Sequence, residues 1–159
     1  MQILIASLLL VLTVAQVRAN ELQLVVNGKA IHHSNKNLHA KNYGLGYEYE
    51  LAPREHWLPF VNGSFLKDSL VTTSNYLVGG IKPRFELRDD PNGWHADVGF
   101  FGYLLTRKDY DDDHLFSGIL PVLSVGKQWF AVNATYIPKM SPNHVNLFFF
   151  QLKFRLAEF

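Results

Sequence analysis

Asp68 and Ser69 stand side by side in the stretch FLKDSL, between two apolar runs of the sequence. His32 and His33 end a much earlier apolar run. A histidine that takes a proton from a hydroxyl, with a carboxylate to orient or charge it, is an arrangement that acyl transfer uses. Adjacent aspartate and serine are also ordinary turn residues, and a histidine at a strand end needs no catalytic role. The choice between these interpretations depends on whether the fold brings the two segments together.

The elements that must position these residues are short apolar runs rich in Tyr, Phe, Val and Leu and bounded by Gly, Pro, Asn and Asp. No long stretch carries the apolar stripe of an amphipathic helix. The runs therefore predict β-strands. We expect eight strands, over residues 21–33, 42–52, 57–67, 73–88, 94–107, 118–126, 128–138 and 144–156.

The connections between the predicted strands alternate in character. Those after the second, fourth and sixth strands are tight, whereas those after the odd-numbered strands are longer or richer in functional groups. Short turns at one end and long loops at the other are typical of outer-membrane barrels. The sequence thus predicts an all-β fold, an eight-stranded antiparallel up-and-down transmembrane β-barrel. In such a barrel His32 or His33 and the Asp68-Ser69 pair lie on the same rim, because each ends an odd-numbered strand.

Alternation within the strands supports a barrel with two chemically different faces. In the second strand, aromatic and aliphatic residues alternate with the set Gly44, Gly46, Glu48 and Glu50. In the last strand, the apolar residues alternate with Gln151, Lys153 and Arg155, and the chain ends in the aromatic Phe159, out of phase with them. An apolar band facing lipid and a polar lumen explain this pattern. A soluble barrel such as a lipocalin is the alternative, and it would point its apolar face inward.

Residues 1–19, MQILIASLLLVLTVAQVRA, have the apolar character and length of an export signal, with Val17-Arg18-Ala19 before the expected cleavage point. We expect a signal peptide over residues 1–19 and an outer-membrane β-barrel domain over residues 20–159. An uncleaved anchor is the alternative, since no Lys or Arg precedes the apolar segment.

The remaining composition excludes several classes of protein. Without residues 1–19 the chain has 14 Lys and Arg against 14 Asp and Glu, and these charges are interspersed. No nucleic-acid partner is indicated, because no basic face stands out. Cysteine is absent, which excludes disulfides and Cys-ligated metal sites.

Two segments resemble a known enzyme family. The stretch FLKDSLVTTSNYLVGG is similar to the Phe-Lys-Asp-Ser region of the lipid A palmitoyltransferases (PagP), which are eight-stranded outer-membrane barrels. The stretch LPVLSVGKQWFAVNATYIPKMSPNHVNLFFFQLKFRL resembles the family's Leu-Pro-x-x-Ser-Val-Gly, Thr-Tyr-Ile-Pro and closing aromatic strand, in the same order. Together these segments cover about half of the chain after residue 19.

The resemblance implies catalytic residues by position. The family's Asp-Ser pair falls on Asp68 and Ser69, and its histidine falls on His32 or His33, of which we expect His32. Ser69 is then either a nucleophile or a positioning donor. The turn interpretation of Asp68-Ser69 remains the alternative.

The resemblance also implies substrate-binding residues. The family's glycine at the floor of its acyl-chain pocket falls on Gly80, where a missing side chain would leave room for an acyl methyl. Pro121 and Pro138 match prolines beside a lateral opening, because proline donates no ladder hydrogen bond. The alternatives are a glycine that relieves crowding in a strand and ordinary strand-end prolines.

Two other functions compete with this interpretation. The stretch AIHHSN resembles the His-x-Ser-Asn motif of PagL-type lipid A deacylases, in which His32 and Ser34 would be base and nucleophile; that family carries the motif near its carboxyl end. A non-enzymatic, OmpX-like structural or adhesive barrel is the other. The acidic run at residues 108–118 would suit it by meeting divalent cations, or would be a solvated loop.

From the sequence we therefore expect a PagP-like acyltransferase that moves a palmitoyl-type chain from a phospholipid to lipid A or a related lipid. His32, Asp68 and Ser69 would lie at an outer rim that faces the cell exterior, with the acyl tail in the barrel above Gly80. This chemistry requires no metal, nucleotide or redox cofactor. We expect a monomer in the outer membrane of a Gram-negative-type envelope.

Overall fold

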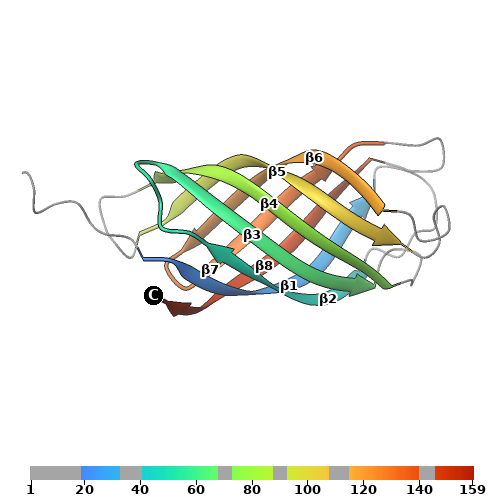
Figure 1. The fold of residues 1–159 in the computed structure, drawn as a ribbon, viewed down its shortest axis with the longest axis horizontal. Helices are drawn as coiled ribbons and strands as arrows, with labels where there is room; N and C mark the ends of the chain where they lie inside the picture. Colours follow the sequence, from blue (N-terminus) through green and yellow to red (C-terminus); the bar gives the residue numbers. More distant parts are fainter. Residues whose placement is uncertain (1–18, 33–40, 68–72, 88–92, 108–114, 140–145) are drawn as a thin grey trace, which may run out of the picture.

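The computed structural model describes residues 19–32, 41–67, 73–87, 93–107, 115–139 and 146–159. Within them, eight strands form one closed barrel, each antiparallel to its neighbours, with β1 and β8 completing the circle (Figure 1). The strands are β1 (Glu21–His32), β2 (Lys41–Glu50), β3 (Trp57–Lys67), β4 (Thr73–Glu86), β5 (His95–Arg107), β6 (Leu115–Lys127), β7 (Phe130–Ile137) and β8 (Leu147–Glu158). The predicted barrel is confirmed. In the part of the chain that the structure describes, no helix is long and apolar enough to cross a membrane.

The strands differ from the prediction mainly at their ends. β6 begins at Leu115 rather than at residue 118, because its ladder with β5 continues to the pair Thr106 and Leu115. Pairing with a long neighbour therefore carries the strand through Gly118, which the sequence pattern takes as a boundary. β8 extends to Glu158 because its ladder with β1 continues that far.

The barrel has two distinct ends. At the proximal end, Asn20 and Phe159 exchange backbone hydrogen bonds of 3.1 and 2.9 Å, and the connections after β2, β4 and β6 turn back. The strands β1, β3, β5 and β7 finish at the opposite, distal end (Figure 1). The arrangement follows from the up-and-down order of the strands, in which odd-numbered and even-numbered strands run in opposite directions.

The exterior of the barrel is apolar and its interior is polar over much of its length. Large apolar side chains point outward, as at Ile119, which is 77% exposed, and Phe100, which is 63% exposed. Charged and amide side chains are buried inside, as at Glu48, Lys82 and Asn133. The lipocalin alternative is therefore wrong, since its alternation has the opposite sense. An outward apolar band is what a bilayer requires of a spanning barrel.

All three tryptophans lie near the proximal end. Trp57 begins β3, Trp94 precedes β5, and Trp129 lies in the turn between β6 and β7, and each side chain is exposed. Tryptophan prefers the level of the lipid headgroups. These residues therefore mark one membrane interface on the proximal side of the apolar band.

A register shift explains the phase of the terminal aromatic. In the β1–β8 ladder, Leu22 pairs with Ala157 but Gln23 pairs with Arg155, so Leu156 is an extra residue. The shift leaves Glu158 on the inner side, where it lines a cavity, and Phe159 68% exposed. Phe159 thus reaches the solvent- or lipid-facing side although the simple alternation of β8 predicts otherwise.

Candidate functional site

The strands next to the predicted catalytic residues finish at the distal end of the barrel. The backbone of His32 ends β1 and pairs with Leu147 of β8. Lys67 ends β3 at the same end, and Asp68 follows it in the chain. Asp68 and Ser69 lie outside the described residues, as do His33 and Ser34. The common end is thus confirmed for the strands, and the meeting of His32 with Asp68 and Ser69 stays a prediction.

Gly80 lies on the inner face of β4. Its neighbours two residues away, Val78 and Lys82, are both buried in the lumen. Gly80 pairs with Phe60 on β3 and with Phe101 on β5. A Cβ at this position would lie 2.5 Å from the carbonyl oxygen of Phe100 and 2.7 Å from Cβ of Phe101. The site has no room for a larger residue unless the backbone moves.

Pro121 and Pro138 flank the point where the pairing of β6 with β7 stops. That ladder runs from Lys127 and Phe130 to its last pair, Val122 and Thr135. Among the described residues, the part of β6 before Val122 pairs with β5 but not with β7. Pro121 begins this unpaired edge, and Pro138 directly follows β7. The missing amide hydrogens of proline fit such a place.

Two apolar clusters line part of the distal half of the lumen, beside buried polar residues such as Asn62 and Ser64. One buried cluster contains Ala30 and Phe149, and a second, nearer the middle, contains Phe60, Val78 and Val122. The side chain of Tyr76 packs against both clusters, which joins them into one lining. The sequence pattern did not reveal this lining, because the alternation suggested a polar lumen throughout.

A small polar group sits on one wall of this lining. The hydroxyl of Tyr76 donates to Oδ1 of Asn27 at 2.7 Å and accepts a hydrogen bond from Nε2 of Gln151 at 2.6 Å. The same Nε2 atom donates to Asn27 Oδ1 at 2.7 Å. The three side chains satisfy one another, as buried polar groups must.

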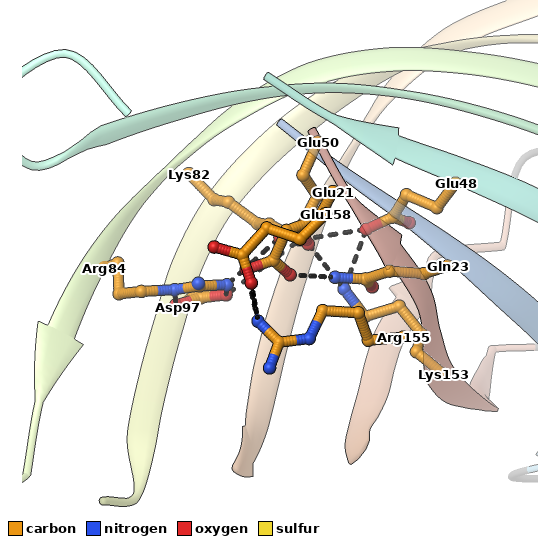
Figure 2. Close-up of polar contacts among 10 residues, drawn as sticks. All are labelled: Glu21, Gln23, Glu48, Glu50, Lys82, Arg84, Asp97, Lys153, Arg155 and Glu158. Atoms are coloured by element: carbon orange, nitrogen blue, oxygen red, sulfur yellow. Dashed lines mark hydrogen bonds and ion pairs between the residues drawn. The ribbon is translucent and has the colours of Figure 1, made fainter. Parts of the chain in front are cut away.

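The proximal half of the lumen holds a buried ionic cluster, shown in Figure 2. Its members are three acids and three bases: Glu48, Glu50, Asp97, Lys82, Arg84 and Lys153. Nζ of Lys82 lies 3.0 Å from Glu48 and 2.6 Å from Glu50, and Nζ of Lys153 contacts the same two carboxylates at 2.7 and 2.8 Å. Opposite charges thus balance in a space where Lys82 and Asp97 are 0% exposed.

The rest of the cluster is held by a guanidinium fork. Arg84 donates from Nε and Nη2 to the two carboxylate oxygens of Asp97, at 2.8 and 2.9 Å. Such paired hydrogen bonds fix geometry as well as charge. The members of the cluster come from β2, β4, β5 and β8 and meet inside the barrel (Figure 2). The alternation of β2 and β8 indicated some of these inward charges but not their shared contacts.

A cavity of about 310 Å³ opens at the proximal end, on the other side of the ionic cluster from His32. Arg84 and Lys153 form part of its wall, together with Gln23, Trp129 and Arg155. This vestibule is therefore separate from the predicted catalytic rim. Among the described residues, no group of His, Asp and Glu could hold a metal ion.

Comparison with known proteins identifies the family. The profile of a family described as "Antimicrobial peptide resistance and lipid A acylation protein PagP" matches residues 36–153. The chain belongs to the PagP family. The match includes Asp68, Ser69, Gly80, Pro121 and Pro138, and it begins after His32. The resemblance expected from the sequence motifs is confirmed.

A curated PagP relative gives a shorter alignment. It is the lipid A acyltransferase PagP of Methylobacillus flagellatus, 34% identical over 58 residues. The alignment covers 36% of this chain and 32% of the relative, so it spans about a third of each.

Solved structures with a similar shape belong to another outer-membrane barrel. The crystal structure of Ail, the attachment invasion locus protein of Yersinia pestis, is 10% identical, with a TM-score of 0.44 over 87% of this chain and 99% of Ail. The structure of Ail in a phospholipid bilayer nanodisc has the same identity, coverage and TM-score. The assignment to the PagP family rests on the sequence match and not on this likeness.

Proposed function

We propose that this protein is an outer-membrane acyltransferase that moves a palmitoyl-type chain from a phospholipid to lipid A or a related lipid. The observation that carries the proposal is the PagP family match across residues 36–153. The spanning barrel supports it, because donor and acceptor are both membrane lipids and the apolar exterior keeps the protein among them.

The proposed reaction is an ester exchange. A hydroxyl of the acceptor attacks the carbonyl carbon of the donor ester, a new carbon–oxygen bond forms, and the bond to the glycerol oxygen breaks. His32 takes the proton of the attacking hydroxyl and returns it to the departing glycerol oxygen, which leaves a lysophospholipid. Asp68 orients the histidine or stabilises its charge. Ser69 either takes the acyl chain first, as a nucleophile, or positions the ester.

The distal lumen provides a place for the acyl tail during this reaction. The lining from Phe149 to Phe60 is apolar and begins near the end of β1, where His32 lies. The acyl tail of a membrane lipid moves here from the hydrocarbon of the bilayer to another apolar environment, so its methylenes are not exposed to water in either place. An ester at the distal rim would therefore place its tail in the lumen, with Gly80 near the lower limit.

The unpaired edge of β6 offers a lateral route for the tail. Strands closed by a full ladder leave no passage from lipid to lumen, whereas the edge before Val122 lacks partners on β7 among the described residues. Pro121 and Pro138 keep that edge from pairing. We propose that the donor enters here. The distal rim would face the cell exterior, with the tryptophans at the periplasmic interface.

The test is to express the wild type and Ser69→Ala in a lipid A-producing outer membrane and to record lipid A by mass spectrometry. We expect the wild type to add the mass of one acyl chain and Ser69→Ala to lose that product. Ser117→Ala is the matched control, since Ser117 is an exposed serine on β6. Comparing the gel mobility of unheated and heated samples would verify that the variants contain equal amounts of folded barrel.

Other outcomes of this experiment distinguish the rival functions. A folded wild type that leaves lipid A unchanged would contradict acylation of lipid A and favour the structural barrel. A loss of mass from lipid A, abolished by Ser34→Ala, would instead identify a deacylase.

A further inference from the structure

Three inner positions form one row across neighbouring strands. Phe60 on β3 pairs with Gly80 on β4, and Gly80 pairs with Phe101 on β5. Phe60 is 4% exposed and belongs to the central apolar cluster, against which Phe101 packs. The row therefore lies inside the barrel and crosses the lumen wall at the depth where the acyl tail is expected to end.

The glycine allows the two phenyl rings to meet across it. The ring centroids of Phe60 and Phe101 are 6.4 Å apart and the rings are inclined by 74°, which is an edge-to-face contact. The space above Gly80 is already occupied, because Cβ of Phe101 lies 2.7 Å from where a Cβ of residue 80 would be. In this chain an acyl methyl would consequently meet the aromatic rings before it reached the backbone of Gly80.

Phe60 also forms the boundary with the ionic cluster. Nζ of Lys82 lies 4.6 Å from the centroid of the Phe60 ring, and the same atom bonds Glu48 and Glu50. The Phe60 side chain also packs with Val78 and Val122 in the apolar cluster. A hydrocarbon chain that passed Phe60 would separate buried charges from their partners, which is costly. Phe60 therefore lies where the apolar cluster meets the charges, beside Asn62, which donates to Glu48 at 3.1 Å.

We propose that the pair Phe60 and Phe101, rather than Gly80 alone, is the floor of the acyl compartment and sets the longest acyl chain that the enzyme transfers. The inference rests on the proposed acyl transfer and assigns its chain-length selectivity to two residues. Gly80 then has an indirect role, since it allows the rings to close over the strand.

The test uses the full-length barrel, folded into vesicles that contain lipid A and an equal mixture of phospholipids with acyl chains of increasing length. The products are identified by the mass of the acylated lipid A. We expect Phe60→Ala to shift the preferred chain by about two carbons or more toward longer chains, because a phenyl ring fills the volume of several methylenes. Phe60→Trp should shift the preference toward shorter chains. Phe101→Leu should lengthen the chain less than Phe60→Ala.

Two controls isolate the effect of the floor. Phe65→Ala changes the same residue type on β3 but at an exposed outer position, and Phe100→Ala does so on β5. Both variants should transfer acyl chains of the same length as the wild type does. If Phe60→Ala does not fold, Phe60→Leu provides the same test with a smaller change in volume.

The two possible failures give different results. If the wild type and the controls acylate lipid A while the folded Phe60 and Phe101 variants keep the wild-type chain-length distribution, the aromatic floor is wrong and the acyltransferase stands. If the folded wild type transfers no acyl chain, the proposed function is wrong, and the floor assigned to its acyl compartment is wrong with it.

Discussion

The distal and proximal halves of the lumen have the same backbone geometry and opposite chemistry. In both halves alternate residues of each strand point inward. In the distal half these residues are uncharged, with apolar clusters at Val78, Val122 and Phe149 beside polar residues, whereas in the proximal half they form the ionic cluster. A single barrel can therefore contain both apolar clusters and a buried ionic cluster without a change of fold. The boundary between them is the row that contains Phe60 and Gly80.

The largest expected effect on stability comes from substituting Lys82 in the ionic cluster of the proximal half. Lys82→Met removes the base that contacts Glu48, Glu50 and Asp97. Three carboxylates would then share fewer positive partners in a buried space. We expect the free energy of unfolding to fall by about 3–5 kcal/mol, because loss of one member leaves buried charge uncompensated. Urea unfolding of the barrel in lipid vesicles measures this change.

Glu158→Gln is the control for that experiment. Glu158 pairs with Arg155 at 3.0 Å, but its side chain is 49% exposed. Removing this charge should lower the free energy of unfolding by less than about 1 kcal/mol, because solvent screens exposed pairs. If Lys82→Met and Glu158→Gln lowered the free energy of unfolding by the same amount, burial would not increase the contribution of the ionic cluster to stability.

A smaller effect is expected at the boundary itself. Gly80→Ala places a Cβ 2.5 Å from the carbonyl oxygen of Phe100 and 2.8 Å from Cα of Phe101, both backbone atoms that cannot rotate away. Overpacking of this kind should lower the free energy of unfolding by about 1–3 kcal/mol. Thermal or urea unfolding would detect it.

The neighbouring glycine provides a matched comparison. A Cβ at Gly79 would be 4.0 Å from the nearest atom, the carbonyl oxygen of Phe60, which is ordinary contact. Gly79→Ala should therefore leave stability nearly unchanged. A loss as large as that of Gly80→Ala would mean that strand flexibility, and not crowding at the row, explains the result.

The smallest effect concerns the polar group in the distal half. Tyr76→Phe removes the hydroxyl between Asn27 and Gln151, but these two side chains keep their own hydrogen bond of 2.7 Å. Because neither partner is left without a hydrogen bond, we expect the free energy of unfolding to fall by only about 1 kcal/mol. Tyr47→Phe, on the exposed face of β2, is the control. A much larger decrease in the free energy of unfolding would show that the polar group stabilises the apolar lining as a whole.

Much of the barrel could be predicted from the sequence, and the candidate site only in part. Eight apolar runs and alternating connection lengths indicated the strands, because each signal is local. The motif around Asp68 and Ser69 indicated the family that the match over residues 36–153 identifies. The meeting of these residues with His32 depends on side chains of the distal end and stays a prediction. The aromatic pair Phe60 and Phe101 was missed, because its members belong to different strands and share no motif.

By itself the sequence determined the number and order of strands and the common end of His32 and Lys67, since both follow from local alternation and strand parity. Alternation is symmetric between the two faces of a strand, so only closure of the barrel decided that the apolar face is outside. Tertiary structure also decided which charges meet: Lys153 and Glu48 are 105 residues apart and bond at 2.7 Å. Their contact depends on the register of two strand pairs, β2 with β1 and β1 with β8. The contact of Lys82 with Glu48 depends on two more, β2 with β3 and β3 with β4. The bulge opposite Leu22 likewise turns Glu158 inward and Phe159 outward, because one extra residue reverses the side-chain phase of a strand.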